Sequence, residues 1–94
     1  MEKVIITKKA VEDLVRWTVK ECENVRLVSE KRPVSVSFVG SYQVEVKVDI
    51  EIKAGLNIVE KTEELRKQIK TTLEKHARLD LRYSKITVRG LYDE

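Results

Sequence analysis

Tyr42-Gln43-Val44-Glu45-Val46-Lys47-Val48-Asp49-Ile50-Glu51-Ile52-Lys53 is the stretch of this sequence that decides the fold. From Val44 to Ile52 every second side chain is aliphatic, and those between them are polar or charged. A two-residue alternation of this kind is typical of a strand with one buried face and one wet face. We therefore predict a long strand over residues 42–53, which Gly55 ends.

In the sequence before this strand and in the sequence after it, apolar residues recur at three- and four-residue steps. This spacing predicts two amphipathic helices. Thr7 is the expected N-cap of the first helix, and Asn57 with Glu60 has the spacing of a capping box at the start of the second. The first stripe comprises Val11, Leu14, Val15, Thr18, Val19 and Cys22, and the second Ile58, Thr62, Leu65, Ile69, Thr72, Leu73 and His76.

Three shorter strands complete the prediction. Val4-Ile5-Ile6 forms the first, residues 34–38 form a hairpin with the long strand through a two-residue turn at Gly40-Ser41, and residues 83–88 form the last. We expect Gly90 to loosen the chain after that last strand. The order β-α-β-β-α-β predicts an α+β two-layer sandwich over residues 1–94, with both helices on one face of a four-stranded sheet, ferredoxin-like or a close variant.

The composition bounds the class of protein. With 94 residues, 41% hydrophobic and 37% charged, the chain has enough apolar material for one small core. No apolar run approaches the roughly 20 residues of a membrane span, and no leader pattern precedes the first strand, so the cytoplasm is the expected compartment. The bias toward Lys and Glu, with few Asn, Gln, Cys and Met, is typical of proteins from hot environments.

No constellation of catalytic or metal-binding residues stands out, so we predict a protein without enzymatic activity, cofactor or metal. Cys22 is the only cysteine, which excludes an internal disulfide and a multi-cysteine metal site. His76 is the only histidine, and we expect it partly buried near the end of the second helix. The three glycines form no phosphate-binding loop, and adjacent carboxylates stand where water screens them.

Weak binding of nucleic acid is the alternative function. The predicted strand order suits RNA-recognition domains, but the wet face of the long strand carries no aromatic residue and three carboxylates. The net charge of +3 is small for a nucleic-acid-binding domain. A group of basic residues can still hold phosphates weakly, and its predicted members are Arg26, Lys31, Arg32, Arg78, Arg82 and Lys85.

Trp17 is the strongest candidate for a contact with another protein. At 100° per residue it points about 130° away from the apolar stripe of the first helix, on the side of Ala10 and Asp13. An exposed tryptophan is unusual, and this residue type dominates many protein–protein hot spots. We predict that Trp17, Ala10 and Asp13 form part of a contact with a second copy or a partner. The competing interpretation is that the ring packs against a loop or the tail near Tyr92.

In this order the residues resemble the alkaline-shock-protein family of bacterial envelope-stress proteins. Ile6-Thr7 leading through the first apolar stripe to Glu23-Asn24-Val25 is similar to the family's opening strand, helix and Glu-Gly-Val. The stretch from Val44 to Gly55-Leu56-Asn57-Ile58 looks like its long strand, glycine and helix entry. Leu65, Ile69 and Leu73 followed by Ile86-Thr87-Val88 are similar to its second helix and final strand.

The chain departs from that family at three places. Asn24 stands where the family usually has Gly, Val59 where it often has Pro, and His76-Ala77-Arg78-Leu79 replaces Met-Thr-Gly-Leu. The resemblance implies a non-enzymatic protein that associates with itself and with a membrane-anchored partner. It supplies no catalytic residue.

Overall fold

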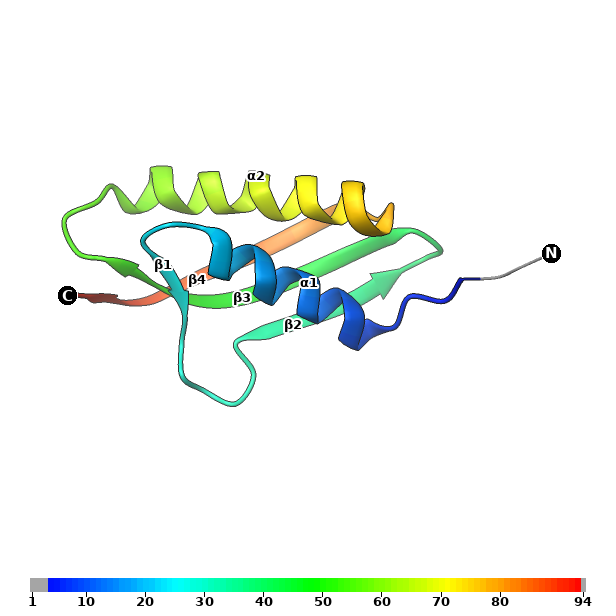
Figure 1. Cartoon of the computed structure of the whole chain (residues 1–94), viewed down its shortest axis with the longest axis horizontal. Helices are drawn as coiled ribbons and strands as arrows, with labels where there is room; N and C mark the ends of the chain where they lie inside the picture. Colours follow the sequence, from blue (N-terminus) through cyan, green and yellow to red (C-terminus); the bar gives the residue numbers. More distant parts are fainter. Residues whose placement is uncertain (1–3, 94) are drawn as a thin grey trace.

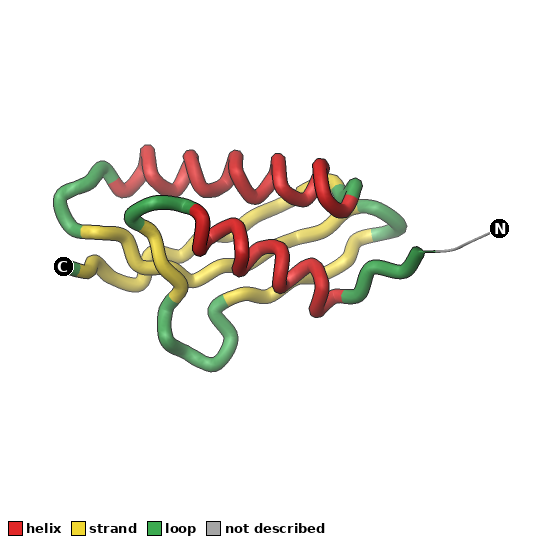
Figure 2. The backbone as a smooth tube through the Cα atoms, in the orientation of Figure 1, coloured by secondary structure: helices red, strands yellow, loops and turns green. Residues whose placement is uncertain are grey.

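The computed structural model describes residues 4–93, which fold into two helices lying on one face of a four-stranded sheet (Figures 1 and 2). This confirms the predicted two-layer α+β sandwich. The elements are α1 (Lys8–Glu21), β1 (Val25–Leu27), β2 (Val34–Val39), β3 (Gln43–Lys53), α2 (Ile58–Ala77) and β4 (Asp80–Tyr92).

The long strand β3 is the centre of the sheet. The short strands β1 and β2 lie end to end along one side of it, both antiparallel, and β4 runs parallel to it along the other side. Asp49 marks the junction, because its N–H donates to the Pro33 carbonyl while its own carbonyl accepts from the Val28 N–H. The loop from residue 28 to residue 33 therefore leaves the sheet and returns to it on the same side.

The alternation in the sequence is realised in β3. Val44, Val46, Val48, Ile50 and Ile52 are all fully buried under the helices, while the residues between them face away. The helices bury the central parts of the predicted stripes against this face, with Val11 and Val15 from α1 and Leu65, Ile69 and Leu73 from α2. Ile58, predicted as the start of the second stripe, is 41% exposed. The Thr7 hydroxyl accepts from the Ala10 N–H at 3.2 Å and the Asn57 side chain accepts from the Glu60 N–H at 3.0 Å, as both predicted N-caps require.

The predicted first strand is wrong. Val4 and Ile5 are 86% and 73% exposed and belong to no strand; only Ile6 packs against the core. β1, which lies in the segment of mixed composition after α1, occupies the sheet instead. The order of the described elements is α-β-β-β-α-β, because a short apolar run forms a strand only where the fold brings it alongside a strand edge.

Three smaller expectations are also corrected. Val39 pairs with Gln43, so the turn holds three residues, Gly40 to Tyr42, and not two. Gly90 lies inside β4, which continues to Tyr92 because the strand pairs with β3 up to Lys53. His76 is exposed, since Leu73 and Ala77 occupy the buried positions of the last turns of α2.

Candidate interaction surfaces

Trp17 stands on the outer side of α1, 49% exposed, as the helical geometry predicts. Its ring meets the ring of His76 on α2 edge to face, with centroids 6.1 Å apart and planes at 84°. An arrangement of this kind contributes about 0.5–1.5 kcal/mol beyond the area it covers, so the indole is held in place while half of it stays in water. The alternative contact with Tyr92 is wrong, because that ring lies under the Arg26 guanidinium, 4.1 Å from it.

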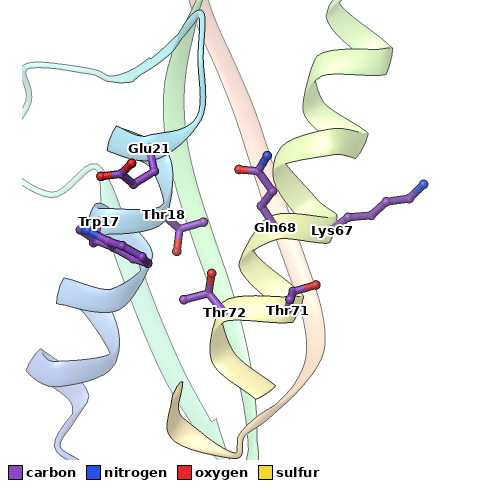
Figure 3. A pocket seen from close by; sticks show the side chains of 7 residues that line it. All are labelled: Trp17, Thr18, Glu21, Lys67, Gln68, Thr71 and Thr72. Atoms are coloured by element: carbon purple, nitrogen blue, oxygen red, sulfur yellow. The ribbon is translucent and has the colours of Figure 1, made fainter. Parts of the chain in front are cut away.

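A hollow of about 340 Å³ opens between the two helices beside Trp17 (Figure 3). Trp17 and Thr18 approach it from α1, and Thr72 faces them from α2. The Thr18 hydroxyl donates to the Leu14 carbonyl at 2.8 Å, so its hydrogen-bonding capacity is used within α1. We call this the inter-helix hollow; its lining residues are Trp17, Thr18, Glu21, Lys67, Gln68, Thr71 and Thr72.

A second hollow of about 370 Å³ lies on the opposite side of the same ring. It is lined by Trp17, Asp13, Arg16 and Lys20 of α1 together with Leu27 of β1. Trp17 and Asp13 are thus brought to one surface, as predicted. Ala10 is exposed on the same helix but lines neither hollow.

The six predicted phosphate-binding residues do not form one patch. Arg26 is held by Glu51 at 2.8 Å and covers Tyr92, and Arg78 lies at the far end of α2 as its C-cap. Arg82 lines a hollow beside Arg66 and Lys70, and Lys85 lies opposite Lys47 in the sheet. Only two members, Lys31 and Arg32, line the same hollow.

Those two join other basic residues that the sequence did not single out. A hollow of about 470 Å³ lies between the first turns of α1 and the loop before β2. Its charged lining comprises five basic residues and one acidic residue, Glu12. We call it the basic hollow; its lining residues are Lys8, Lys9, Glu12, Arg16, Lys31, Arg32, Val34 and Ser35. Residues 8–16 and residues 31–35 meet only through the packing of α1 on β2, so no local pattern predicts the cluster.

The open face of the sheet carries more kinds of side chain than the polar and charged residues of β3 alone predict. Register pairs place Tyr83 beside Glu45 and Tyr92 beside Lys53, so two aromatic rings reach the wet face from β4. Arg89 lies on the same side, 3.6 Å from Asp49 and 3.3 Å from Glu30. Ion pairs this exposed contribute about 0–1 kcal/mol each, so they order the face more than they stabilise it.

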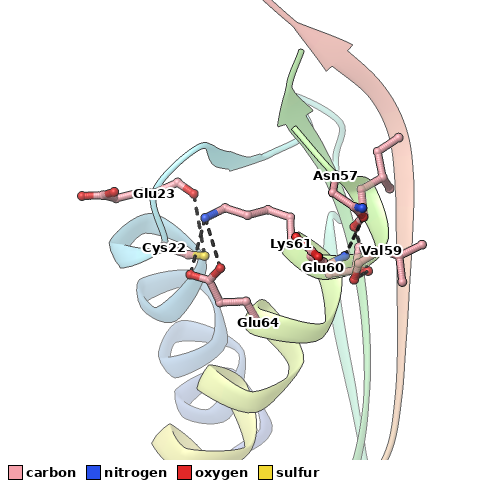
Figure 4. Close-up of polar contacts among 9 residues, drawn as sticks. Cys22, Glu23, Asn57, Val59, Glu60, Lys61 and Glu64 are labelled. Carbon is pink, nitrogen blue, oxygen red and sulfur yellow. Dashed lines mark hydrogen bonds and ion pairs between the residues drawn. The ribbon is translucent and has the colours of Figure 1, made fainter. Parts of the chain in front are cut away.

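Cys22 is 3% exposed, at the end of α1 against the first turns of α2 (Figure 4). Burial raises the pKa of its thiol; Lys61 partly offsets this, whereas Glu64 and Glu23 raise it further. Lys61 itself pairs with Glu64 at 3.3 Å. A buried, protonated thiol is inert, which favours the packing role.

No metal site is found among residues 4–93, because no three His, Cys, Asp or Glu side chains there are grouped to hold an ion. Nor does any helix in this part of the chain have the length and apolar character to cross a membrane.

Searches against protein-family models, curated proteins and solved structures find no match to this chain.

Proposed function

We propose that this chain is a non-enzymatic binding module whose main contact surface for a protein partner is centred on Trp17. The observation that carries the proposal is a half-exposed indole standing between two hollows on one helical surface. A partner that covers Trp17 can fill the hollow on each side of it, and buried aromatic anchors of this kind supply most of the binding energy in many interfaces.

The ring is suited to this role because its position is largely fixed before binding. α1 is held to the sheet by Val11, Val15 and Val19, each at most 1% exposed, and His76 supports one side of the indole. Little conformational entropy is then lost when a partner binds, which favours affinity. Asp13 adds a carboxylate at the margin of the surface.

The resemblance to the alkaline-shock-protein family supports a membrane-anchored partner and a role in envelope stress. Two of the departures from that family fall where it has glycine, and both positions have a left-handed backbone: φ is 64° at Asn24 and 52° at Arg78. Glycine adopts this conformation without strain, and asparagine tolerates it better than most other residues. A glycine preference at both sites is therefore compatible with this backbone.

Capture from the cells that produce the protein tests this function. Wild type, Trp17→Ala and Tyr42→Ala serve as baits, and captured proteins are identified before their affinities are measured with purified partner. Tyr42 is the matched control, since it is 68% exposed in the turn before β3 and lines neither hollow beside Trp17. Trp17→Ala is expected to weaken binding about 30-fold or more and Tyr42→Ala to leave it unchanged. Equal affinity of all three would refute the Trp17 surface.

A second candidate function, weak binding of nucleic-acid backbone, is favoured by the basic hollow. Five cationic side chains line it with a single carboxylate, beside the N-terminus of α1, whose dipole also favours anions. Because such contacts act by releasing counterions, we expect binding that is indifferent to sequence and lost near physiological salt.

Titration of a single-stranded RNA and of a DNA duplex at several salt concentrations checks this candidate. Replacing both Lys31 and Arg32 by Glu should abolish the low-salt binding, whereas Arg78→Glu, at the C-cap of α2 and outside the basic hollow, should leave most of it. Submicromolar RNA affinity retained at physiological salt would show that a specific site exists.

A further inference from the structure

The outer edge of β4 is the longest of the strand edges that the described part of the chain leaves open. β4 has 13 residues and pairs with β3 along one side only, and none of its residues is buried. An unpaired edge of this length presents a row of backbone N–H and C=O groups that another strand can bind.

The hydrogen bonds at the two ends of β4 show which residues direct these groups outward. The Asp80 N–H donates to the Tyr42 carbonyl at 2.8 Å, and the Tyr92 carbonyl accepts from the Ala54 N–H at 2.9 Å, so both residues point toward β3. Directions alternate along a parallel pair, and the register shifts opposite Val44/Glu45 and Ile50/Glu51 leave a regular segment, residues 83–88, between them. Asp49 directs its N–H and C=O to Pro33 and Val28 on the other side of β3, so its partner Thr87 must direct its own groups toward β3. By alternation, Ser84, Ile86 and Val88 direct their N–H and C=O groups away from β3.

We propose that two copies of this chain pair through β4, antiparallel about a two-fold axis at Ile86, to form one continuous sheet. In this register Ile86 exchanges both backbone bonds with Ile86 of the second copy. Ser84 does the same with Val88 of the second copy, and Lys85 lies opposite Thr87. The pairing uses the outward-facing backbone groups that the structure leaves without a strand partner.

The charges on β4 favour this register and favour a second copy of the chain as the pairing strand. A shift that centres the axis on Lys85 places two lysines directly opposite each other, and a shift that centres it on Thr87 places Lys85 opposite Arg89. Like charges directly opposite each other destabilise an antiparallel pair. The axis at Ile86 avoids both clashes, so the strand is complementary to itself in this one of the three registers.

Pairing also covers apolar side chains of β4 that α2 shields only in part. Ile86 and Val88 face the helices but are only half-buried, whereas their neighbours in β3, Val48 and Ile50, are fully buried. A second copy beside β4 shields both from the edge. The segment is short, so the expected dimer is weak and dissociates on dilution.

Charge substitution at Thr87 is the sharpest test, because this side chain lies on the open face opposite Lys85 of the second copy. Thr87→Lys creates two like-charge pairs in each dimer and should raise the dissociation constant about tenfold; Thr87→Glu should lower it by a similar factor. Within one chain Thr87 neighbours Asp49, so the two substitutions act on monomer stability in the opposite sense. Sedimentation over a concentration series, with thermal unfolding in parallel, measures both effects.

Cross-linking tests the register itself. In a Cys22→Ser background, the double variant Lys85→Cys, Thr87→Cys should form two disulfides between copies on mild oxidation, because these positions face each other about 4.5 Å apart at Cα. Either single variant should cross-link poorly. Efficient cross-linking by Lys85→Cys alone would show that the axis passes elsewhere.

This inference adds to the proposed binding function and is separable from it. Trp17→Ala should dimerise like wild type, while Thr87→Lys should still bind the partner protein. A wild-type protein that stays monomeric up to roughly 1 mM, or a dimer indifferent to both Thr87 substitutions, would overturn the β4 proposal and leave the Trp17 surface standing.

Discussion

The two edges of the sheet are protected in opposite ways. β2 has six residues, none of them charged, and pairs with β3 without a register shift. β4 carries Arg82, Lys85 and Arg89 and has two register shifts opposite β3. Charges and bulges are both devices that discourage unwanted strand pairing, yet only one edge uses them.

The two strands differ in how completely their helix-facing side chains are buried. α1 packs on the helix-side face of β2, where Val34 and Val36 are 2% and 0% exposed, so the apolar side chains of this strand are kept from water although its short outer edge is unpaired. No residue of β4 is buried, and its edge is therefore controlled by its own side chains. An apolar edge strand is tolerated where it is short and its apolar side chains are buried, whereas the long β4, whose side chains stay partly in water, carries charges that restrict how it pairs.

The same division separates the proposed surfaces. Trp17 lies on the outer side of α1, and the basic hollow lies where the first turns of α1 meet the loop before β2, so binding to partners is assigned to the side of the molecule that α1 covers. Self-association is assigned to β4. Four measurements can break or sharpen this contrast.

The largest effect is expected beneath α2, where Leu65 and Ile69 are fully buried. Replacing either by Ala should lower the free energy of unfolding by about 2–5 kcal/mol, because transfer and cavity costs add. Leu91→Ala on β4, where the side chain is 53% exposed, is the matched control and should cost less than about 1 kcal/mol. Urea unfolding measures all three. A loss below about 0.5 kcal/mol at Leu65 or Ile69 would show that the buried face of α2 is misassigned.

The second measurement compares the two edges with one residue type. Val36 on β2 is 0% exposed and Val88 on β4 is half-buried, and both face the helices. Val36→Ala should cost about 2 kcal/mol and Val88→Ala about 1 kcal/mol or less, since less surface is removed from water at the open edge. Unfolding is measured at a concentration where the protein is monomeric. Equal losses would mean that α1 gives β2 no more cover than β4 has.

The parts of the fold that could be predicted from the sequence are those that depend on residues close together in the chain. The alternation from Val44 to Ile52 and the stripes through Val11 and Leu65 were predicted correctly, because each depends on neighbours a few residues apart. The strand expected at Val4-Ile5-Ile6 failed because strand formation depends on an edge contributed by a distant part of the chain.

The surfaces show the same limit. The exposure of Trp17 follows from helical geometry alone and was predicted. Its contact with His76, 59 residues further along the chain, was not. Tyr83 reaches the open face through its pairing with Glu45, and Lys31 meets Lys8 through the packing of α1 on β2. No local pattern encodes these contacts, which explains why the predicted basic group was dispersed and a different one was found.

The smallest effect concerns Cys22, because the pKa of its thiol depends on how completely water is excluded from the covered side. Because burial raises its pKa, the folded chain keeps a proton that the unfolded chain releases once the pH passes the ordinary thiol value. The stabilisation is thus complete below the ordinary pKa and declines as the pH rises above it. Unfolding by urea from pH 7 to pH 10 should show this decline in wild type and a smaller one in Cys22→Ser.

The rate at which a thiol reacts with a disulfide reagent allows Cys22 to be compared with a cysteine placed on the open face. A chain carrying Cys22→Ser and Thr87→Cys presents its thiol on the open face of the sheet, where Thr87 is half-buried, and should react somewhat more slowly than an unfolded chain. Native Cys22 should react more than about a hundredfold more slowly, because the reagent reaches it only when the structure opens locally. If Cys22 and the introduced thiol at position 87 reacted at similar rates in the folded chains, the end of α1 would not be firmly packed on α2. The contrast between a covered and an open side would then lose its support there.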